Sequence, residues 1–378
     1  MSNQGSIPGK RNHVYYFDYL RVIAAICVIY MHVASGPLRR VINIDWHMEN
    51  LLICFSFTAV PLFFMMSGYL LLSSEKTTDV SLLFKKRIPH LLVPLIGWTV
   101  VAALWDMFNT KNYSLEFLYN KLVSSLSSPA KVHFWYMYTL IALYILSPII
   151  HAALHALTKK GHILVLVLIS LVSIKYMLKA VTPASFDRYL ELDIINKMTF
   201  FSGHASSFVL GWYLGNLKKK IPNGLLVSAA AVVLGIITIG TYIVTKIAGS
   251  FNQSFQTQSA GFEVLLAAII FIFFKQNANK PSRVLKHIPI VPLSLSVYLM
   301  HNILLSVMFK YGFSVNTFLD TVFITALNLF ICLIVMKTVA TIKPLCFIAT
   351  GMSYKTACET CNWVWTFRKF FKKKEVKE

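Results

Sequence analysis

Residues 15–35 read YYFDYLRVIAAICVIYMHVAS, an apolar run long enough to cross a bilayer as one helix. Asp18, Arg21 and His32 stand inside this run. Ionisable side chains in a membrane are costly, so they indicate a functional site. On an α-helix the path from Arg21 to His32 turns about 1,100°, roughly 20° past three full turns, and rises about 16 Å. Both side chains are therefore predicted to project from one face at different depths.

The composition of the whole chain is that of a membrane protein. Of its 378 residues, 56% are hydrophobic, 14% are aromatic and only 13% are charged, which excludes an ordinary soluble domain. With about twenty apolar residues for each bilayer crossing, the sequence predicts spans at 15–36, 51–72, 88–108, 133–154, 162–180, 198–217, 223–247, 260–276, 290–310 and 317–340. We therefore predict an all-α, polytopic integral membrane protein with about ten transmembrane helices.

The charge of the chain is strongly basic, with 36 Lys and Arg against 15 Asp and Glu, a net charge of +21. The positive residues gather in alternate loops, at 76–87, 159–160, 218–220 and 280–286, and in the tail RKFFKKK. By the positive-inside rule these loops and both termini are predicted to be cytoplasmic, in a multi-pass protein of the inner membrane. We interpret the cations as contacts with membrane lipids, and predict no nucleic-acid partner.

The predicted domain organisation is simple. Residues 1–14 form a cytoplasmic segment, residues 15–345 one transmembrane domain, and residues 346–378 a basic cytoplasmic tail. The tail sequence WVWTFRKFFKKK suits either an amphipathic segment on the inner leaflet or a disordered tail. Cys358 and Cys361 form a single CxxC without a second pair, so no metal site is predicted.

Two predicted spans carry polar groups near the cytoplasmic side. The segment PLFFMMSGYLL places Ser67 beside Gly68, which indicates either a site in a broken helix or a kink with small-residue packing. The segment FKKRIPHLLVP places Lys86 and Arg87 at the mouth of the next span. These cations suit a phosphorylated ligand, and ordinary membrane anchoring predicts them equally well.

Further polar and aromatic residues lie in later spans. The segment HFWYMYTLIALYILSP suits an aromatic belt or a platform for a sugar, and SLSVYLMHN places Tyr298 and His301 on neighbouring faces of a helix. Glu263 is an intramembrane acid without an evident partner. The candidate substrate-binding residues are His133, Trp135, Tyr136, Glu263, Tyr298 and His301.

These segments, together with the ten-residue spacing between Arg21 and His32 and the segment FVLGWYLG, resemble the bacterial acyltransferase 3 family over about residues 15–340. The resemblance implies a membrane enzyme that moves an acyl group, usually acetyl from cytoplasmic acetyl-CoA, to a hydroxyl of an envelope glycan. It implies that Arg21 and His32 are catalytic. It further implies that Ser67, and Arg87 with Lys86, belong to the site of the coenzyme A thioester.

The chemistry of the residues is compatible with acyl transfer. The reaction needs a base for the hydroxyl proton, for which His32 is the candidate, and cations for the coenzyme A phosphates, for which Arg21 and the pair Lys86 and Arg87 are candidates. Two alternatives stay open. One is a transporter or flippase for a lipid-linked sugar, which also uses intramembrane charges and broken helices. The other is an acyltransferase with a different donor, such as succinyl-CoA.

Overall fold

The computed structural model describes residues 13–182, 203–257, 261–282, 285 and 288–361. Among these residues it contains helices and connecting segments and no β-strand. The α-helices are α1 (Tyr15–Ala34), α2 (Ile44–Ser56), α3 (Ala59–Leu72), α4 (Val80–Leu82), α5 (Pro89–Thr110), α6 (Leu115–Ser124), α7 (Trp135–Ala156), α8 (Lys159–Val181), α11 (His204–Asn216), α12 (Asn223–Ala248), α13 (Phe262–Asn277), α14 (Ile290–Lys310), α15 (Phe318–Ala340), α16 (Lys343–Thr350) and α17 (Tyr354–Cys361). Single turns of other helix types are η1 (Pro37–Arg39), η2 (Glu75–Thr77), η3 (Leu83–Arg87) and η4 (Val132–Phe134).

Eight helical segments of the described chain are long and apolar enough to cross a membrane. They are α1, α2 with α3, α4 with α5, α7, α8, α12, α14 and α15. They coincide with eight of the ten predicted spans, and they confirm an all-α, multi-pass membrane architecture.

The two other predicted spans, 198–217 and 260–276, contain shorter helices. Helix α11 has 13 residues and α13 has 16. Each is preceded by a glycine with positive φ, 79° at Gly203 and 78° at Gly261. A helix does not continue through this backbone conformation, so α11 and α13 cannot extend backwards as straight helices. The first residues of both predicted spans lie outside the described chain.

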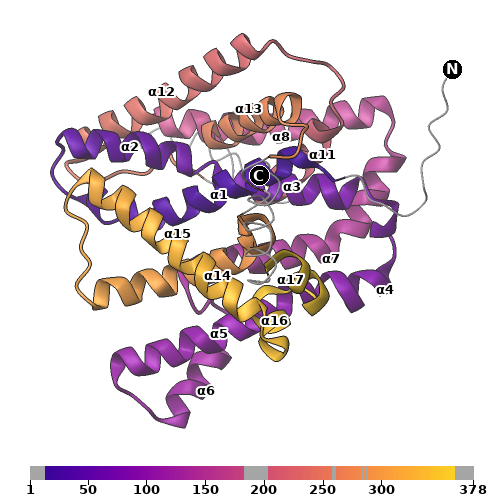
Figure 1. Ribbon diagram of the computed structural model, residues 1–378. Helices are drawn as coiled ribbons and strands as arrows, with labels where there is room; N and C mark the ends of the chain where they lie inside the picture. Colours follow the sequence, from indigo (N-terminus) through magenta and orange to yellow (C-terminus); the bar gives the residue numbers. More distant parts are fainter. Residues whose placement is uncertain (1–12, 183–202, 258–260, 283–284, 286–287, 362–378) are drawn as a thin grey trace, which may run out of the picture.

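Helix α1 is the centre of the bundle. It packs against α2, α3, α13, α14 and α15, and Figure 1 shows it between α2 and α13 on one side and α14 and α15 on the other. In the membrane-crossing segments, 61% of the residues are buried for α1 and 72% for α2 with α3, against 17% for α8 and for α12. The exposed apolar residues of α8 and α12 therefore suit contact with lipid, whereas the polar side chains of α1 are mostly or partly enclosed by protein.

The second predicted span, 51–72, is broken. Helix α2 ends at Ser56 and α3 begins at Ala59, with Phe57 and Thr58 between them. Pro61 explains the position of the break, because its ring has no N–H and clashes with the carbonyl four residues earlier, at Phe57.

Helices α3 and α11 approach each other closely through glycines. A Cβ added at Gly68 would lie 1.8 Å from the Phe208 carbonyl oxygen, and one at Gly211 would lie 2.1 Å from that of Met65. One turn further along α11, a Cβ at Gly215 would collide with the ring of Tyr69. The two backbones are therefore in direct contact, as in membrane pairs of the small-xxx-small type.

The C-terminal helices α16 and α17 fold back on the bundle. Trp98 of α5 donates its Nε1–H to the Ala349 carbonyl at 3.0 Å, and His90 bonds the Gly351 carbonyl. Up to Cys361 the segment is thus packed against α5 and α15. The lysine-rich end of the predicted tail lies outside the described residues.

Candidate active site

Three histidines from distant parts of the chain meet beside α1. His32 belongs to α1, His133 to η4 just before α7, and His301 to α14. The ring centroids are 5.1 Å apart for His32 and His301, 4.8 Å for His133 and His301, and 5.8 Å for His32 and His133. We call these three residues the histidine cluster; all three were predicted as site residues.

Hydrogen bonds to carbonyl groups fix two of these rings. His133 Nε2 lies 3.3 Å from the Leu299 carbonyl oxygen, and His301 Nδ1 lies 2.6 Å from that of Tyr298. A carbonyl only accepts, so both nitrogens carry hydrogen in the neutral rings. His133 Nδ1 and His301 Nε2 are then lone pairs, and both are buried without a hydrogen-bond partner in the described structure. The cluster therefore contains two buried hydrogen-bond acceptors, His133 Nδ1 and His301 Nε2, that have no donor within the described structure.

Tyr298 connects the cluster to the start of α7. Its hydroxyl donates to the His133 carbonyl, and its ring centroid lies 5.6 Å from that of His133. On the far side of α14, Asn328 of α15 donates to the His301 carbonyl at 3.0 Å. These bonds hold α14 between α7 and α15 at the level of the cluster.

His32 has a polar partner that the sequence analysis missed. The side-chain amide nitrogen of Asn302 lies 3.2 Å from His32 Nδ1. The His32 carbonyl accepts from the Ser35 hydroxyl at 3.0 Å. The only signal for Asn302 in the sequence is its place directly after His301.

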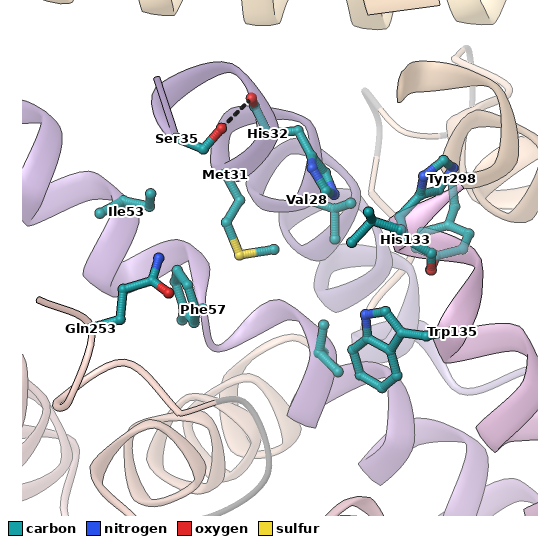
Figure 2. A pocket seen from close by; sticks show the side chains of 12 residues that line it. Val28, Met31, His32, Ser35, Ile53, Phe57, His133, Trp135, Gln253 and Tyr298 are labelled. Atoms are coloured by element: carbon teal, nitrogen blue, oxygen red, sulfur yellow. Dashed lines mark hydrogen bonds between the residues drawn. The ribbon is translucent and has the colours of Figure 1, made fainter. Parts of the chain in front are cut away.

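A cavity of about 180 Å³ opens beside the cluster. Figure 2 shows Trp135, His133 and Tyr298 on one side of it and Phe57 and Gln253 on the other. Its lining residues are Val28, Met31, His32, Ser35, Ile53, Phe57, Val60, Val132, His133, Trp135, Gln253 and Tyr298. His301 is fully buried and stands behind this wall. Most of the wall is apolar, so the few polar groups decide how a ligand is oriented.

A second group of polar residues gathers toward the N-terminal end of α1. Arg21 lies within electrostatic range of the hydroxyls of Tyr136 and Tyr144, and Tyr144 is also within range of Arg87. The Ser67 hydroxyl is within hydrogen-bonding reach of Tyr136. We call Arg21, Ser67, Tyr136, Tyr144 and Arg87 the arginine cluster. Tyr144 was not predicted, because one tyrosine in an aromatic span carries no distinguishing signal.

The two cationic side chains predicted at the third span are not equivalent. Arg87 is half-buried and donates to the Thr77 hydroxyl at 2.9 Å. Lys86 is exposed, and among the described residues it makes no hydrogen bond or ion pair. The segment Leu83–Arg87 is a π-helical turn, which shifts the register of the helix and is frequent at functional sites.

Arg21 keeps only a loose ion pair with Asp18, at 3.9 Å, and its side chain is 30% exposed. Asp18 lies closer to His13, at 2.6 Å. The guanidinium of Arg21 is therefore not saturated by its neighbour on α1 and keeps donors for another acceptor.

Tyr136 connects the two clusters. Its ring centroid lies 5.2 Å from that of Tyr298 and 4.8 Å from that of Phe64, while its hydroxyl faces Ser67 and Arg21. The structure thus brings together His32, His133, Tyr298 and His301 at one level, and Arg21 and Ser67 at the other, with Tyr136 between them.

Glu263 lies in a different place. It is fully buried at the start of α13, and both carboxyl oxygens lack a hydrogen-bond partner within the described residues. Its polar surroundings include Cys54 of α2, whose sulfur accepts from Gln256 at 3.3 Å. Glu263 does not line the cavity beside His32.

His204, at the start of α11, was also missed. Its ring stacks on Phe64, with centroids 4.9 Å apart, and lies 4.7 Å from the ring of Trp135. It therefore supports the wall that Trp135 contributes to the cavity. The residue before it, Gly203, sets its position through a positive φ.

The arrangement combines three chemical abilities. The histidine cluster can take up or deliver a proton, the cavity can hold a partly apolar molecule with hydroxyl groups, and the arginine cluster can bind negative charge. Within the described residues, no group of three His, Cys, Asp or Glu side chains is arranged to hold a metal ion.

Comparison with known proteins gives one result. A family model of the acyltransferase domain, acyltransferase 3, matches residues 14–337. Neither the curated proteins nor the solved structures gave a match.

Proposed function

Since the chain belongs to the acyltransferase 3 family and is a membrane acyltransferase, we propose that it moves an acetyl group from cytoplasmic acetyl-CoA to a hydroxyl group of a bacterial envelope glycan. The acceptor is a polysaccharide or a lipid-linked glycan. We further propose that, within the family, the chain resembles the O-acetyltransferase of enterobacterial common antigen, in keeping with an acetyl donor and a glycan acceptor.

The observation that carries this proposal is that two polar groups lie at two levels of one face of α1, with apolar residues between them. Arg21 and His32 lie on the same helix, and each is joined by groups from other spans that suit its own part of the reaction. In this proposal the protein lies in the inner membrane with both termini in the cytoplasm. The arginine cluster, near the N-terminal end of α1, then faces the cytoplasm, where the donor acetyl-CoA is. The histidine cluster and its cavity then face the acceptor side.

At the donor side, Arg21 and Arg87 supply positive charge for the phosphates of coenzyme A. Tyr144 adds a hydroxyl group near both guanidinium groups, and Tyr136 with Ser67 adds two more on the side of Arg21. Lys86, exposed at the same end of the third span, contributes long-range attraction only.

At the acceptor side, His32 takes the proton from the attacking hydroxyl. The hydroxyl oxygen forms a bond to the thioester carbonyl carbon, the carbon–sulfur bond breaks, and the sulfur receives the proton. The carbonyl oxygen becomes an oxyanion on the way, and hydrogen-bond donors of the cavity wall stabilise it. His133, Trp135 and Tyr298 orient the sugar, and His301 supports His133 and His32 from behind.

The test is a comparison of the envelope glycans of cells with and without the gene by mass spectrometry. A lost mass of one acetyl group supports the proposal. A lost succinyl mass would show a different donor, and unchanged decoration of a reduced amount of glycan would favour a transporter or flippase. Purified protein in proteoliposomes should also release free coenzyme A from acetyl-CoA when envelope lipid extract supplies the acceptor.

A further inference from the structure

We infer that Asn302 is a positioning residue that selects which nitrogen of His32 acts as the base. This inference rests on the proposed acyl transfer. It concerns a residue that does not line the cavity and whose side chain bonds His32.

The contact between the two side chains decides the tautomer of His32. Neutral imidazole has one N–H and one lone pair, and the nitrogen that bonds a neighbour determines the state of the other. Asn302 occupies Nδ1, at 3.2 Å, so Nε2 is the nitrogen left for the cavity. The two ends of an amide differ in this respect, because Nδ2 only donates and Oδ1 only accepts.

In the structure the Nδ2 end of Asn302 faces Nδ1, which leaves the lone pair on Nδ1 and the proton on Nε2. His32 then presents an N–H to the cavity and cannot accept a proton there. Rotation of the amide by half a turn brings Oδ1 to the ring. Nδ1–H then donates to Oδ1, and Nε2 becomes the lone pair that takes the hydroxyl proton.

Proton uptake makes the second orientation necessary. Once Nε2 has accepted the proton, both ring nitrogens are donors, and an amide Nδ2–H pointing at Nδ1–H would be repelled. Oδ1 instead stabilises the charged ring. Asn302 therefore supports the base only through its oxygen.

The backbone around Asn302 is held so that a side-chain rotation is the motion available. The Asn302 carbonyl accepts from Ser306 at 3.0 Å, and the preceding carbonyl, of His301, accepts from Asn328. Both bonds are accepted by main-chain oxygens. They therefore do not restrain the side-chain amide of Asn302, which can rotate about its Cβ–Cγ bond.

The test compares Asn302→Asp with Asn302→Leu in proteoliposomes, with acetyl-CoA as donor and envelope lipid extract as acceptor source. Aspartate keeps the accepting oxygen and removes the donor, whereas leucine removes both at similar size. We expect Asn302→Leu to lower kcat by about 100-fold, the lower end of what a correctly poised base contributes. We expect Asn302→Asp to keep at least a tenth of the kcat, with the acidic limb of its pH profile moved to higher pH, because a carboxylate favours the charged ring.

The KM for acetyl-CoA should stay within about twofold in both variants, because Asn302 is remote from the arginine cluster. Ser294→Ala, which loses a hydroxyl bond to the Val291 carbonyl near the start of α14, is the matched control and should keep the wild-type pH profile. Melting in detergent shows whether each variant is folded. An Asn302→Asp variant as inactive as Asn302→Leu, or an Asn302→Leu variant with wild-type kcat, would overturn the inference while wild-type activity stands. A wild-type protein that transfers no acetyl group would instead refute the proposed function.

Discussion

The two clusters that include Arg21 and His32 of α1 are built in different ways. In the histidine cluster, His301 and His133 are held by hydrogen bonds to the main-chain carbonyls of Tyr298 and Leu299, while His32 bonds the side chain of Asn302. The arginine cluster is held by side-chain charges and hydroxyls around Arg21, which is partly exposed. Main-chain bonds fix ring orientation, which proton transfer needs, while charged side chains attract a polyanion without fixing one pose. Substitutions in the histidine cluster should therefore change kcat, and those in the arginine cluster KM.

The largest effect is expected from His32→Ala. Removal of the base should lower kcat by about 10³-fold, within the range that a general base contributes, and leave the KM for acetyl-CoA nearly unchanged. Release of coenzyme A thiol in proteoliposomes measures both constants. His47→Ala, an exposed histidine of α2, is the matched control. Normal acetyl transfer by the His32 variant would remove the histidine cluster from the mechanism.

Arg21→Ala should raise the KM for acetyl-CoA and leave kcat nearly unchanged. Loss of a charge-assisted contact to a phosphate costs about 1.5–3 kcal/mol, which corresponds to a rise of about 10- to 150-fold in the KM for acetyl-CoA. Arg21→Lys should recover part of this loss because it keeps the charge without the planar fork. A fall in kcat with unchanged KM would mean that Arg21 acts on the reacting atoms and not on the donor phosphates.

Tyr298→Phe tests how strongly the main-chain bonds position the first cluster. The variant keeps the ring and loses the hydroxyl bond to the His133 carbonyl. One such bond is worth about 1 kcal/mol, so kcat should fall about fivefold with unchanged KM. Tyr138 also lies on α7, and its hydroxyl bonds the Ser125 carbonyl just after α6. Tyr138→Phe loses this bond and should lower the melting temperature without changing kcat. Equal kcat losses in both variants would indicate a general loss of packing.

The smallest effect is expected at Lys86. Its side chain is exposed, whereas its neighbour Arg87 is half-buried and bonded to Thr77. Lys86→Ala should change the KM for acetyl-CoA by less than about twofold, because exposed charges are screened by salt. Arg87→Ala should raise it about tenfold. The reverse order would show that the donor meets the exposed face of the π-helical turn.

Parts of this architecture can be predicted from the sequence because they depend on one helix at a time. The shared face of Arg21 and His32 follows from their spacing, and the break before α3 follows from Pro61. The meeting of His133 and His301 with His32 depends on the packing of three spans that are far apart in the chain. Each of these histidines could be nominated as an intramembrane polar residue, but nothing local indicates their mutual distance.

The same limit explains what was missed. Asn302 and Tyr144 have ordinary sequence surroundings and gain their meaning only from the neighbours that tertiary packing brings to them. The lengths of α11 and α13 depend on positive φ at Gly203 and Gly261, and a glycine in a sequence does not reveal its φ. Glu263 is predicted as a substrate residue because it is an acid within an apolar span, and in the structure it lies near Cys54, away from the cavity beside His32.

The break between α2 and α3 has a consequence for the range of acceptors. Ile53, Phe57 and Val60, which flank this break, line the cavity opposite His133. The cavity wall opposite His133 therefore includes the break between α2 and α3. Helix α2 contributes no residue to either cluster. We expect a small tilt of α2 to admit a bulkier sugar without displacing His32. The size of acceptor that fits would then be set by α2, and the acyl-transfer chemistry by His32 of α1. The sequence of α2 could therefore diverge to admit other acceptors while the catalytic residues are retained.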